Sequence, residues 1–424
     1  MRWLYILLCV LPLWAASPDI RVLHDDGGWC WFEDERAIAV NGKLLFGVVA
    51  SGRKGNVEAV TYDPKTGQSK VFVLHQPESP EEQRRWMDDH NSPAFLLRPD
   101  GRVLALYAKH GVDEKIYYRI SEPKDTTRWG EERIFVPSPT SRVTYSNPHY
   151  LSAEKRIYNF FRGIHNSFKP SYAYSEDGGE TWTAGNVFIN VPTEFRHRPY
   201  VKYASNGKDT VHIAYTDGHP RNFDNSIYHI VYRKGVLHHS GGAPIRELKG
   251  GLQTPEEGTL VYKGGPNNVA WISDLHLDAK GNPVLVFSEQ RDPSGSDHRY
   301  HYARWDGAMW HEHEIAYAGS RLYPGEDDYT GNIAIVPQSP DQVYISTNAH
   351  PVSGAKMPHY EIFHGITKDG GAHWTWTAIT KNSAQDNIRP ICPIFKGVPE
   401  VLWLQGRMET YTNYRFQVVG LVRK

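Results

Sequence analysis

Residues 90–110 read HNSPAFLLRPDGRVLALYAKH and contain the pattern that decides the fold. A polar start at His90 leads into an apolar run, a Pro-Asp-Gly turn at residues 99–101, a second apolar run at Val103–Tyr107 and a polar end at His110. Two apolar runs joined by Pro, Asp and Gly are typical of a β-hairpin. We therefore predict two antiparallel strands in this stretch.

The same hairpin recurs along the chain at intervals of about 50 to 60 residues, which is a period typical of repeat architectures. The other copies start at Glu35, Tyr145, Arg198, Ser273, Thr330 and Arg389. Further strand-like runs follow the hairpins, such as Ile116–Ile120 and Tyr300–Trp305, so each unit can supply a four-stranded blade. The chain is predicted to be an all-β, seven-bladed β-propeller with four-stranded antiparallel blades.

Composition agrees with one large all-β domain. The 424 residues include 12% aromatic side chains, 37 Gly and 28 Pro, which suits strands and turns better than long helices. No Pro/Ser-rich linker divides the chain, so residues 18–424 are predicted to form a single propeller domain. The run Ile20–Leu23 precedes the first hairpin, and we expect it to complete the last blade and close the ring.

Residues 1–17 are predicted to be a signal peptide. Met-Arg is followed by an apolar run, Trp3–Trp14, and by the small residues of a cleavage site at positions 15–17. The run is shorter than the roughly 20 residues that span a bilayer. We therefore expect a secreted or periplasmic protein without membrane contact after cleavage. Its mature form keeps Cys30 and Cys392, for which two buried free thiols are favoured over a disulfide.

Two blades contain a turn motif known as the Asp-box. Residues 175–182, SEDGGETW, match it in full, and residues 367–374, TKDGGAHW, match it with one deviation. In this motif the Asp side chain and the glycines hold a tight turn between outer strands, while the Trp packs between blades. We therefore interpret Asp177 and Asp369 as structural residues.

Residues at equal distances from a hairpin turn are expected to become neighbours, because antiparallel strands pair across the turn. The pattern pairs His90 with His110 and Tyr145 with Arg162. It also places Arg198 and Tyr200 opposite Asp217 and His219, Asp274 opposite Glu289, and Arg389 opposite Arg407.

One face of the propeller is thereby predicted to be cationic. Its basic residues are His90, His110, Arg162, Arg196, Arg198, His219, Arg221, Arg291, His350, Arg389 and Arg407. Since the formal net charge is only −1, this concentration is local, which favours an anionic glycan over nucleic acid as the partner. Arginine supplies bidentate geometry for carboxylate or sulfate. A structural role between blades is an equally good interpretation of Arg389 and Arg407.

The segment from Asp89 to Tyr200 resembles the propeller-type ulvan lyases and the BNR-repeat proteins related to them. The resemblance extends to nearly the whole mature chain at the level of blades. It implies catalytic roles for His90, His110, Tyr145, Arg162 and Tyr200, although Tyr150 can replace Tyr145 and Tyr203 can replace Tyr200 in the pattern. The predicted substrate-binding residues are Asn91, Asn147, Arg196, Arg198, His219 and Arg221.

The resemblance implies β-elimination beside a uronic acid, in which a base removes the C5 proton and the O4 substituent leaves. Histidine and arginine can stabilise the charge that grows on the uronate carboxylate without any required cofactor. Tyr145 can act as the base if Arg162 and the two histidines lower its pKa from about 10. Alternatively, His110 is the base and Tyr145 is the acid.

A structural metal ion is a further option. Asp274, His276 and His301 are expected on adjacent strands of one blade, although their loose spacing favours a packed histidine pair over a metal site. We expect the protein to be a monomer.

Two other functions stay open. A glycoside hydrolase is the first: a retaining sialidase needs a tyrosine nucleophile with a glutamate partner, and the sequence offers Asp34 and Arg36 but no such pair. A rhamnosidase that uses a single histidine also fits. The second is a propeller that binds an acidic glycan without cleaving it.

Overall fold

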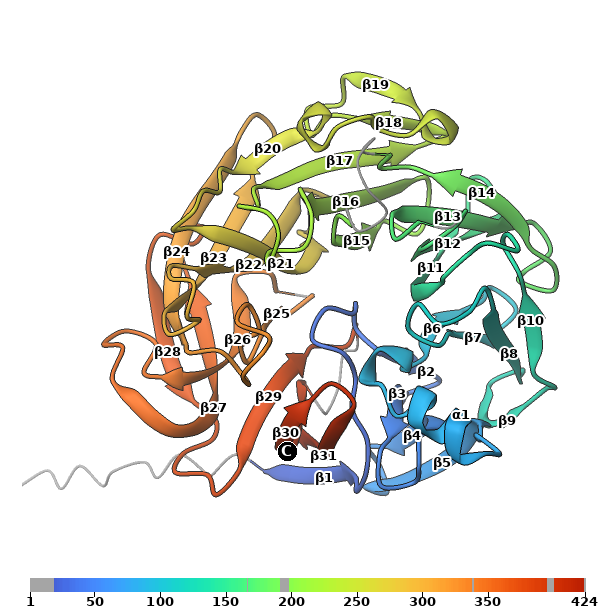
Figure 1. Cartoon of the computed structure of the whole chain (residues 1–424), viewed down its shortest axis with the longest axis horizontal. Coiled ribbons are helices and arrows are strands. Elements are labelled where there is room, and N and C mark those ends of the chain that lie inside the picture. Colours follow the sequence, from blue (N-terminus) through green and yellow to red (C-terminus); the bar gives the residue numbers. More distant parts are fainter. Residues whose placement is uncertain (1–18, 166, 191–197, 338, 395–399, 423–424) are drawn as a thin grey trace, which may run out of the picture.

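The computed structural model describes residues 19–165, 167–190, 198–337, 339–394 and 400–422. These residues form seven antiparallel sheets arranged around a central axis (Figure 1). The predicted seven-bladed β-propeller is therefore confirmed. Residues 1–17, the predicted signal peptide, lie outside the described residues. Within the described ranges, no helix combines the length and apolarity needed to cross a membrane.

Five of the described sheets have four strands each. Blade 1 contains β2 (Ala37–Val40), β3 (Lys43–Ala50), β4 (Asn56–Asp63) and β5 (Gln68–His75). Blade 3 contains β11 (Thr144–Leu151), β12 (Arg156–Arg162), β13 (Pro170–Ser175) and β14 (Thr183–Val187). Blade 5 contains β21 (Val269–Leu277), β22 (Pro283–Gln290), β23 (His298–Trp305) and β24 (Trp310–Gly319). Blade 6 contains β25 (Ile333–Ile335), β26 (Gln342–Ala349), β27 (Lys356–Thr367) and β28 (Trp374–Ala378). Blade 7 contains β29 (Asp386–Ile391), β30 (Leu402–Thr410), β31 (Asn413–Leu421) and β1 (Ile20–His24).

The other two blades carry additional elements. Blade 2 contains β6 (Ala94–Leu97), β7 (Val103–Tyr107), β8 (Ile116–Glu122), β9 (Asp125–Trp129) and β10 (Arg133–Phe135), preceded by helix α1 (Pro80–Trp86) and the 3-10 helix η1 (Asp89–Asn91). Blade 4 contains β15 (Val201–Ser205), β16 (Thr210–Thr216), β17 (Ile227–Arg233), β18 (Val236–His238), β19 (Pro244–Glu247) and β20 (Thr259–Tyr262), with the 3-10 helices η2 (Leu248–Gly250) and η3 (Pro255–Glu257). His90 therefore lies in η1 and not at the start of a strand.

The inner strands are buried on both faces because neighbouring blades pack against each side. All five residues of β7 are buried, whereas most residues of the outer strand β5 are partly or fully exposed. This is why the inner strands appear in the sequence as continuous apolar runs and not as alternating patterns.

The two ends of the described chain meet in blade 7. Strand β1 pairs antiparallel with β31, with Ile20 opposite Leu421 (Figure 1). This confirms that the run at residues 20–23 completes the last blade. Pairing with β31 also hides a strand edge that would otherwise be open to another chain.

Residues 25–36, which we call the plug, connect β1 to β2 and enter the centre of the ring (Figure 1). Their hydrogen bonds reach four different blades: Trp29 and Trp31 donate to the carbonyls of Arg389 and Thr330, the Lys202 ammonium donates to the Glu33 carbonyl, and Arg36 donates to the Ser146 carbonyl. Trp31 and Phe32 also join a buried cluster with Trp271 of blade 5. The plug thus fills the channel and joins opposite sides of the ring.

Two smaller predictions are confirmed. Asp177 accepts hydrogen bonds from the side chains of Ser175 and Thr181 and from the Thr181 backbone, so this Asp-box aspartate is structural. Asp369 accepts equivalent bonds from Thr367 and His373. Cys30 and Cys392 are free and buried.

Two of the predicted strand pairings are wrong. Asp274 lies opposite Val286, while Glu289 lies opposite Ala270. Leu277 pairs with Pro283 next to the turn, so the turn is centred nearer to Asp274 than the prediction assumed, and the irregularity between Ile272 and Asp274 adds a shift of only one residue. In blade 7, Ile388 lies opposite Leu404 and Asp386 lies opposite Gly406, so Arg389 is too close to the turn to pair with Arg407.

The plug should contribute strongly to stability. Trp31 is fully buried, and its ring centroid lies 4.5 Å from that of Trp271. We expect Trp31→Ala to lower the free energy of unfolding by about 3–5 kcal/mol, since it removes a large buried side chain. Chemical denaturation measures the change.

Met309, which is 56% exposed, offers the control substitution Met309→Ala. We expect it to change the free energy by no more than about 0.5 kcal/mol. Equal losses in both variants would contradict the role given to the plug.

Candidate active site

A pocket of about 350 Å³ lies at the end of the axis where the inner strands begin. Blades 2, 3 and 4 supply most of its functional groups, and blades 6 and 7 add Tyr329 and Tyr411. Seven predicted catalytic or binding side chains of blades 2–4 line it directly: His90, His110, Arg162, Arg198, Tyr200, His219 and Arg221. The hairpin geometry of the sequence therefore brings distant residues to one site.

The two histidines of blade 2 form a stacked pair. Their ring centroids lie 3.9 Å apart with an interplanar angle of 6°. Asp88 holds both rings: its Oδ1 accepts from His90 Nδ1 at 2.6 Å, and its Oδ2 accepts from His110 Nδ1 at 2.9 Å. Both Nδ1 atoms are therefore engaged as donors, which leaves the Nε2 atoms as the groups available for chemistry.

Sequence reasoning missed Asp88. It caps η1, where its carboxylate also accepts from the His90 backbone N–H at 3.0 Å. The signal that could have identified it is an aspartate two residues before a polar His-Asn-Ser stretch, which is a typical position for a helix cap. Its simultaneous contact with His110 depends on the tertiary fold.

The two rings differ in protonation. Burial lowers the pKa of His90, but the neighbouring Cys30, Tyr145 and Asp88 outweigh this effect and raise it well above its usual value. Burial and the positive charge on His90 lower the pKa of His110 to about 4. His90 is therefore an imidazolium near neutral pH, and His110 is a neutral imidazole whose Nε2 carries a lone pair.

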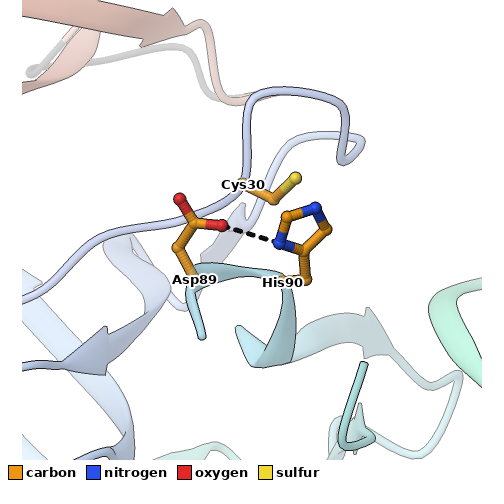
Figure 2. Close-up of side chains that lie close together, drawn as sticks. All are labelled: Cys30, Asp89 and His90. Atoms are coloured by element: carbon orange, nitrogen blue, oxygen red, sulfur yellow. Dashed lines mark ion pairs between the residues drawn. The ribbon is translucent and has the colours of Figure 1, made fainter. Parts of the chain in front are cut away.

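A second carboxylate accounts for part of this difference. Asp89 Oδ1 lies 2.8 Å from His90 Nδ1, and Cys30 lies beside the same ring (Figure 2). Asp89 Oδ2 accepts from Arg389 Nη1 at 2.6 Å, and Arg389 is only 1% exposed. Arg389 thus has the structural role left open by the sequence, which is to hold Asp89 beneath the histidine pair.

Arg162 is the most unusual group of the pocket. It is 6% exposed, and its Nε and Nη1 have no hydrogen-bond partner among the described residues. Its Nη2 lies 3.3 Å from His110 Nε2, and its guanidinium lies 4.6 Å from the ring centroid of Tyr145. A buried cation without a carboxylate partner is costly, so the geometry favours an anionic ligand at this position.

The two tyrosines differ from the sequence-based expectation. Tyr145 packs beside the histidine pair, 5.7 Å from the His90 ring centroid, but burial raises its pKa well above 10 despite the nearby His90 and Arg162. His90 and Arg162 do lower this pKa, but burial outweighs them, so the expected net decrease does not occur. For Tyr200, Arg162 and Arg198 outweigh burial and lower the pKa. Tyr145 also has a left-handed backbone (φ 58°), a strained conformation for tyrosine.

The predicted substrate-binding asparagines have structural contacts. Asn91 is fully buried, donates to the carbonyls of Arg85 and Trp86, and accepts from the His110 backbone N–H at 2.7 Å. Asn147 is also buried and donates to the Tyr145 carbonyl. Each residue therefore orients a neighbouring site residue and does not line the pocket.

The cationic face is smaller than predicted. Arg198, His219 and Arg221 line the pocket, and Arg221 forms an ion pair with Glu326, a carboxylate that the sequence interpretation did not include. Arg196 lies outside the described residues. Three other predicted basic residues do not line the pocket. Arg291 forms ion pairs with Glu289 and Glu314, and Arg407 forms one with Glu409. His350 accepts a hydrogen bond from the backbone of its own turn.

Three groups of side chains in the described residues have metal-ligand geometry. They are Cys30, Asp89 and His90; Asp88, His90 and His110; and Glu35, Asp274 and His276. The optional set of Asp274, His276 and His301 does not come together, because His301 lies between Glu289 and Glu312. The favoured histidine pair is not formed either, since His276 contacts Glu35 and Asp274. The first two groups belong to the pocket described above.

The stacked histidines should titrate separately. We expect NMR of the imidazole nitrogens to show His90 protonated and His110 neutral at pH 6, with His110 gaining a proton only near pH 4. In Asp88→Asn the pKa of His90 should fall by about one unit or more, since a negative neighbour is lost. Two rings that titrate together near pH 6.5 would contradict the asymmetry.

Residues 50–318 match the profile of the BNR repeat-containing family. Among solved structures, an ulvan lyase of polysaccharide lyase family PL25 bound to -[GlcA(1-4)Rha3S]- has a TM-score of 0.72 at 17% identity, with 95% of this chain and 96% of that chain covered. Polysaccharide lyase Uly1 has a TM-score of 0.62 at 13% identity, covering 96% and 100% of the two chains. A search of curated proteins finds no significant match. The structural likeness establishes the propeller fold, and because the profile match spans more than half of the sequence, the chain belongs to the BNR repeat-containing family.

Proposed function

We propose that this protein is an exported polysaccharide lyase that cleaves an acidic, uronate-containing polysaccharide by β-elimination. The observation that carries the proposal is the buried Arg162 guanidinium, two of whose nitrogens have no hydrogen-bond partner among the described residues, beside the lone pair of His110. An anion-binding group and a neutral base in direct contact are what proton removal next to a carboxylate requires.

Binding would begin at the uronate carboxylate. In this mechanism, Arg162 donates to the carboxylate oxygens, and the His90 imidazolium adds a second positive charge nearby. Both groups stabilise the negative charge that develops on the carboxylate when the C5 proton leaves. Once Arg162 turns to the substrate, His110 Nε2 loses its hydrogen-bond donor and becomes free to act as a base.

The chemical step uses His110 and Tyr145. His110 Nε2 takes the C5 proton, the C4–O4 bond breaks, and a C4–C5 double bond forms. Tyr145, whose raised pKa keeps it protonated, donates its proton to the departing O4. His110 then releases its proton and Tyr145 regains one from solvent. The pKa directions favour this division over Tyr145 as the base.

The structural relative supports the choice of substrate class. The PL25 ulvan lyase is bound to -[GlcA(1-4)Rha3S]-, a sulfated glucuronate–rhamnose chain. In this protein, Arg198 and Arg221 line the pocket beside Arg162 and can bind a sulfate on the neighbouring sugar. Export, supported by the predicted leader, would place the enzyme with such extracellular polymers.

A sialidase-like hydrolase fits the structure less well. Asp34 and Arg36, the residues that would support it, line a separate cavity at the end of the axis where the inner strands finish. A binding protein without catalysis remains the other candidate, and the experiments below distinguish it from a lyase.

Incubation with uronate polysaccharides tests the reaction class. We expect a new absorbance in the near ultraviolet, because elimination leaves an unsaturated uronate at the new chain end. Shortening of the polymer without this absorbance would indicate hydrolysis. Binding without shortening would indicate a glycan-binding protein.

Three substitutions test the assigned roles. His110→Ala and Tyr145→Phe should each lower kcat by about 10²–10⁴ while leaving affinity for the polymer largely intact, since proton transfer is lost. Arg162→Met should lower kcat by about 10²–10³ and also weaken binding.

Arg407→Met is the matched control for Arg162→Met. The Arg407 side chain is 80% exposed and lies outside the pocket, so kcat and affinity should stay at wild-type levels. Equal losses for both arginines would show that general surface charge, and not the pocket, determines activity.

A further inference from the structure

A second cluster of ionisable side chains lies at the other end of the axis. Inner strands begin at the candidate active site and finish beside a separate cavity of about 520 Å³, lined by Glu35 of the plug and His276 of β21 among others. Asp274 lies two residues before His276 on the same strand. The donor atoms of Glu35, Asp274 and His276 all lie within 4.8 Å of one another.

In this cluster two carboxylates converge on one nitrogen of His276. His276 Nε2 faces two carboxylate oxygens at once, Glu35 Oε1 at 3.2 Å and Asp274 Oδ1 at 3.4 Å. One imidazole nitrogen carries at most one proton, so it can donate well to only one of them. The proton of His276 Nε2 therefore serves one acid, while Asp274 Oδ1 also accepts from the Leu275 backbone N–H at 2.7 Å.

His301 in the same blade shows the arrangement expected of an ordinary ion pair. Its Nδ1 lies 2.5 Å from Glu312, and its Nε2 lies 2.6 Å from Glu289. Each nitrogen of this protonated histidine thus has its own carboxylate. The convergence of both acids on a single nitrogen of His276 differs from that arrangement. It is shared by His90, whose Nδ1 faces Asp88 and Asp89 and which belongs to the other clusters with metal-ligand geometry.

The distances also fit a metal ion. Zinc binds nitrogen and oxygen ligands at about 2.0–2.2 Å in tetrahedral geometry, which separates neighbouring ligand atoms by roughly 3.3–3.5 Å. The two separations at His276, 3.2 and 3.4 Å, agree with this value. Furthermore, Asp274 is oriented by the backbone N–H groups of Leu275 at 2.7 Å and Ile335 at 2.8 Å, as outer-shell donors orient metal-binding carboxylates.

A further oxygen is available nearby. Asp34 lines the same cavity, and its Oδ2 is shielded from solvent without a hydrogen-bond partner in the described part of the chain. Its other oxygen lies 3.4 Å from the Lys202 ammonium. Either Asp34 or water from the cavity can complete a four-ligand shell.

We propose that Glu35, Asp274 and His276 bind a divalent transition-metal ion of the zinc type. The ion has a structural role: it joins the plug to blade 5 at the end of the channel opposite the candidate active site. This proposal does not depend on the lyase activity, because metal content and stability can be measured without substrate.

Zinc titration of the full-length protein after treatment with a chelator is the test. We expect one Zn²⁺ per chain and a rise of a few degrees in Tm, since a ligand bound only by the folded state stabilises it. Glu35→Gln and His276→Asn should each lower zinc affinity about 100-fold or more, because a ligand is lost outright. His301→Asn is the matched control and should keep the wild-type stoichiometry and affinity.

X-ray absorption at the zinc edge separates this site from the rival cluster that contains Cys30. We expect only nitrogen and oxygen ligands near 2.0–2.2 Å, whereas a sulfur ligand near 2.3 Å would place the ion with Cys30, Asp89 and His90 and overturn the proposal. Wild-type protein that binds no zinc, or unchanged binding in the Glu35 and His276 variants, would overturn it as well. Even if a variant fails to fold, the wild-type stoichiometry and ligand shell still decide the question.

Discussion

Seven blades around one axis leave a central channel, which the plug fills. The packing of the plug in this channel determines which side chains lie at each end of the axis. Trp31 and Phe32 occupy the centre, where Phe32 packs edge-on against Tyr145 and Tyr200 with ring centroids 5.4 and 4.5 Å away. The segment that completes the core therefore also packs against Tyr200, which lines the candidate active site. Four residues after Trp31, the same segment places Glu35 at the opposite cavity.

The charge difference between the stacked histidines follows from their surroundings. Asp88 alone would raise the pKa of both rings in the same way, since it accepts a hydrogen bond from the Nδ1 atom of each ring. His90 has Asp89 as a second carboxylate, whereas His110 has the Arg162 guanidinium next to its Nε2. Two like charges with ring centroids 3.9 Å apart repel strongly in a buried site, so the proton stays on the ring with more negative neighbours.

Much of the fold and part of the site could be predicted from the sequence. Residues at equal distances from a hairpin turn lie next to each other in the folded hairpin, so their spacing in the sequence predicts which side chains are in contact. This works for His90 with His110 and for Tyr145 with Arg162, although His90 lies in η1 and the pairing of β11 with β12 is irregular between Thr144 and Asn147. It fails for Asp274 and Arg389, because the strands of blades 5 and 7 pair about other turn centres than the prediction assumed. Asp88 could not be found in this way because it precedes the paired strands of its own blade, and Glu326 could not because its partner Arg221 comes from another blade.

The sequence identity to the solved lyases is low, so the evidence for function must come from the residues of this chain. Arg162 is the most informative of these residues. Within the part of the chain that the structure describes, Arg162 has no carboxylate partner. Removing such a guanidinium from water costs several kcal/mol, which a structural role alone would not explain. Arg389 is a structural arginine of the same protein and is also buried. Unlike Arg162, it forms an ion pair, in which its Nη1 lies 2.6 Å from Asp89 Oδ2. A ligand carboxylate would provide for Arg162 the charge that Asp89 provides for Arg389, and would stabilise the folded protein only when bound. The contrast between these two buried arginines is therefore a physical argument for an acidic substrate that does not depend on the relatives.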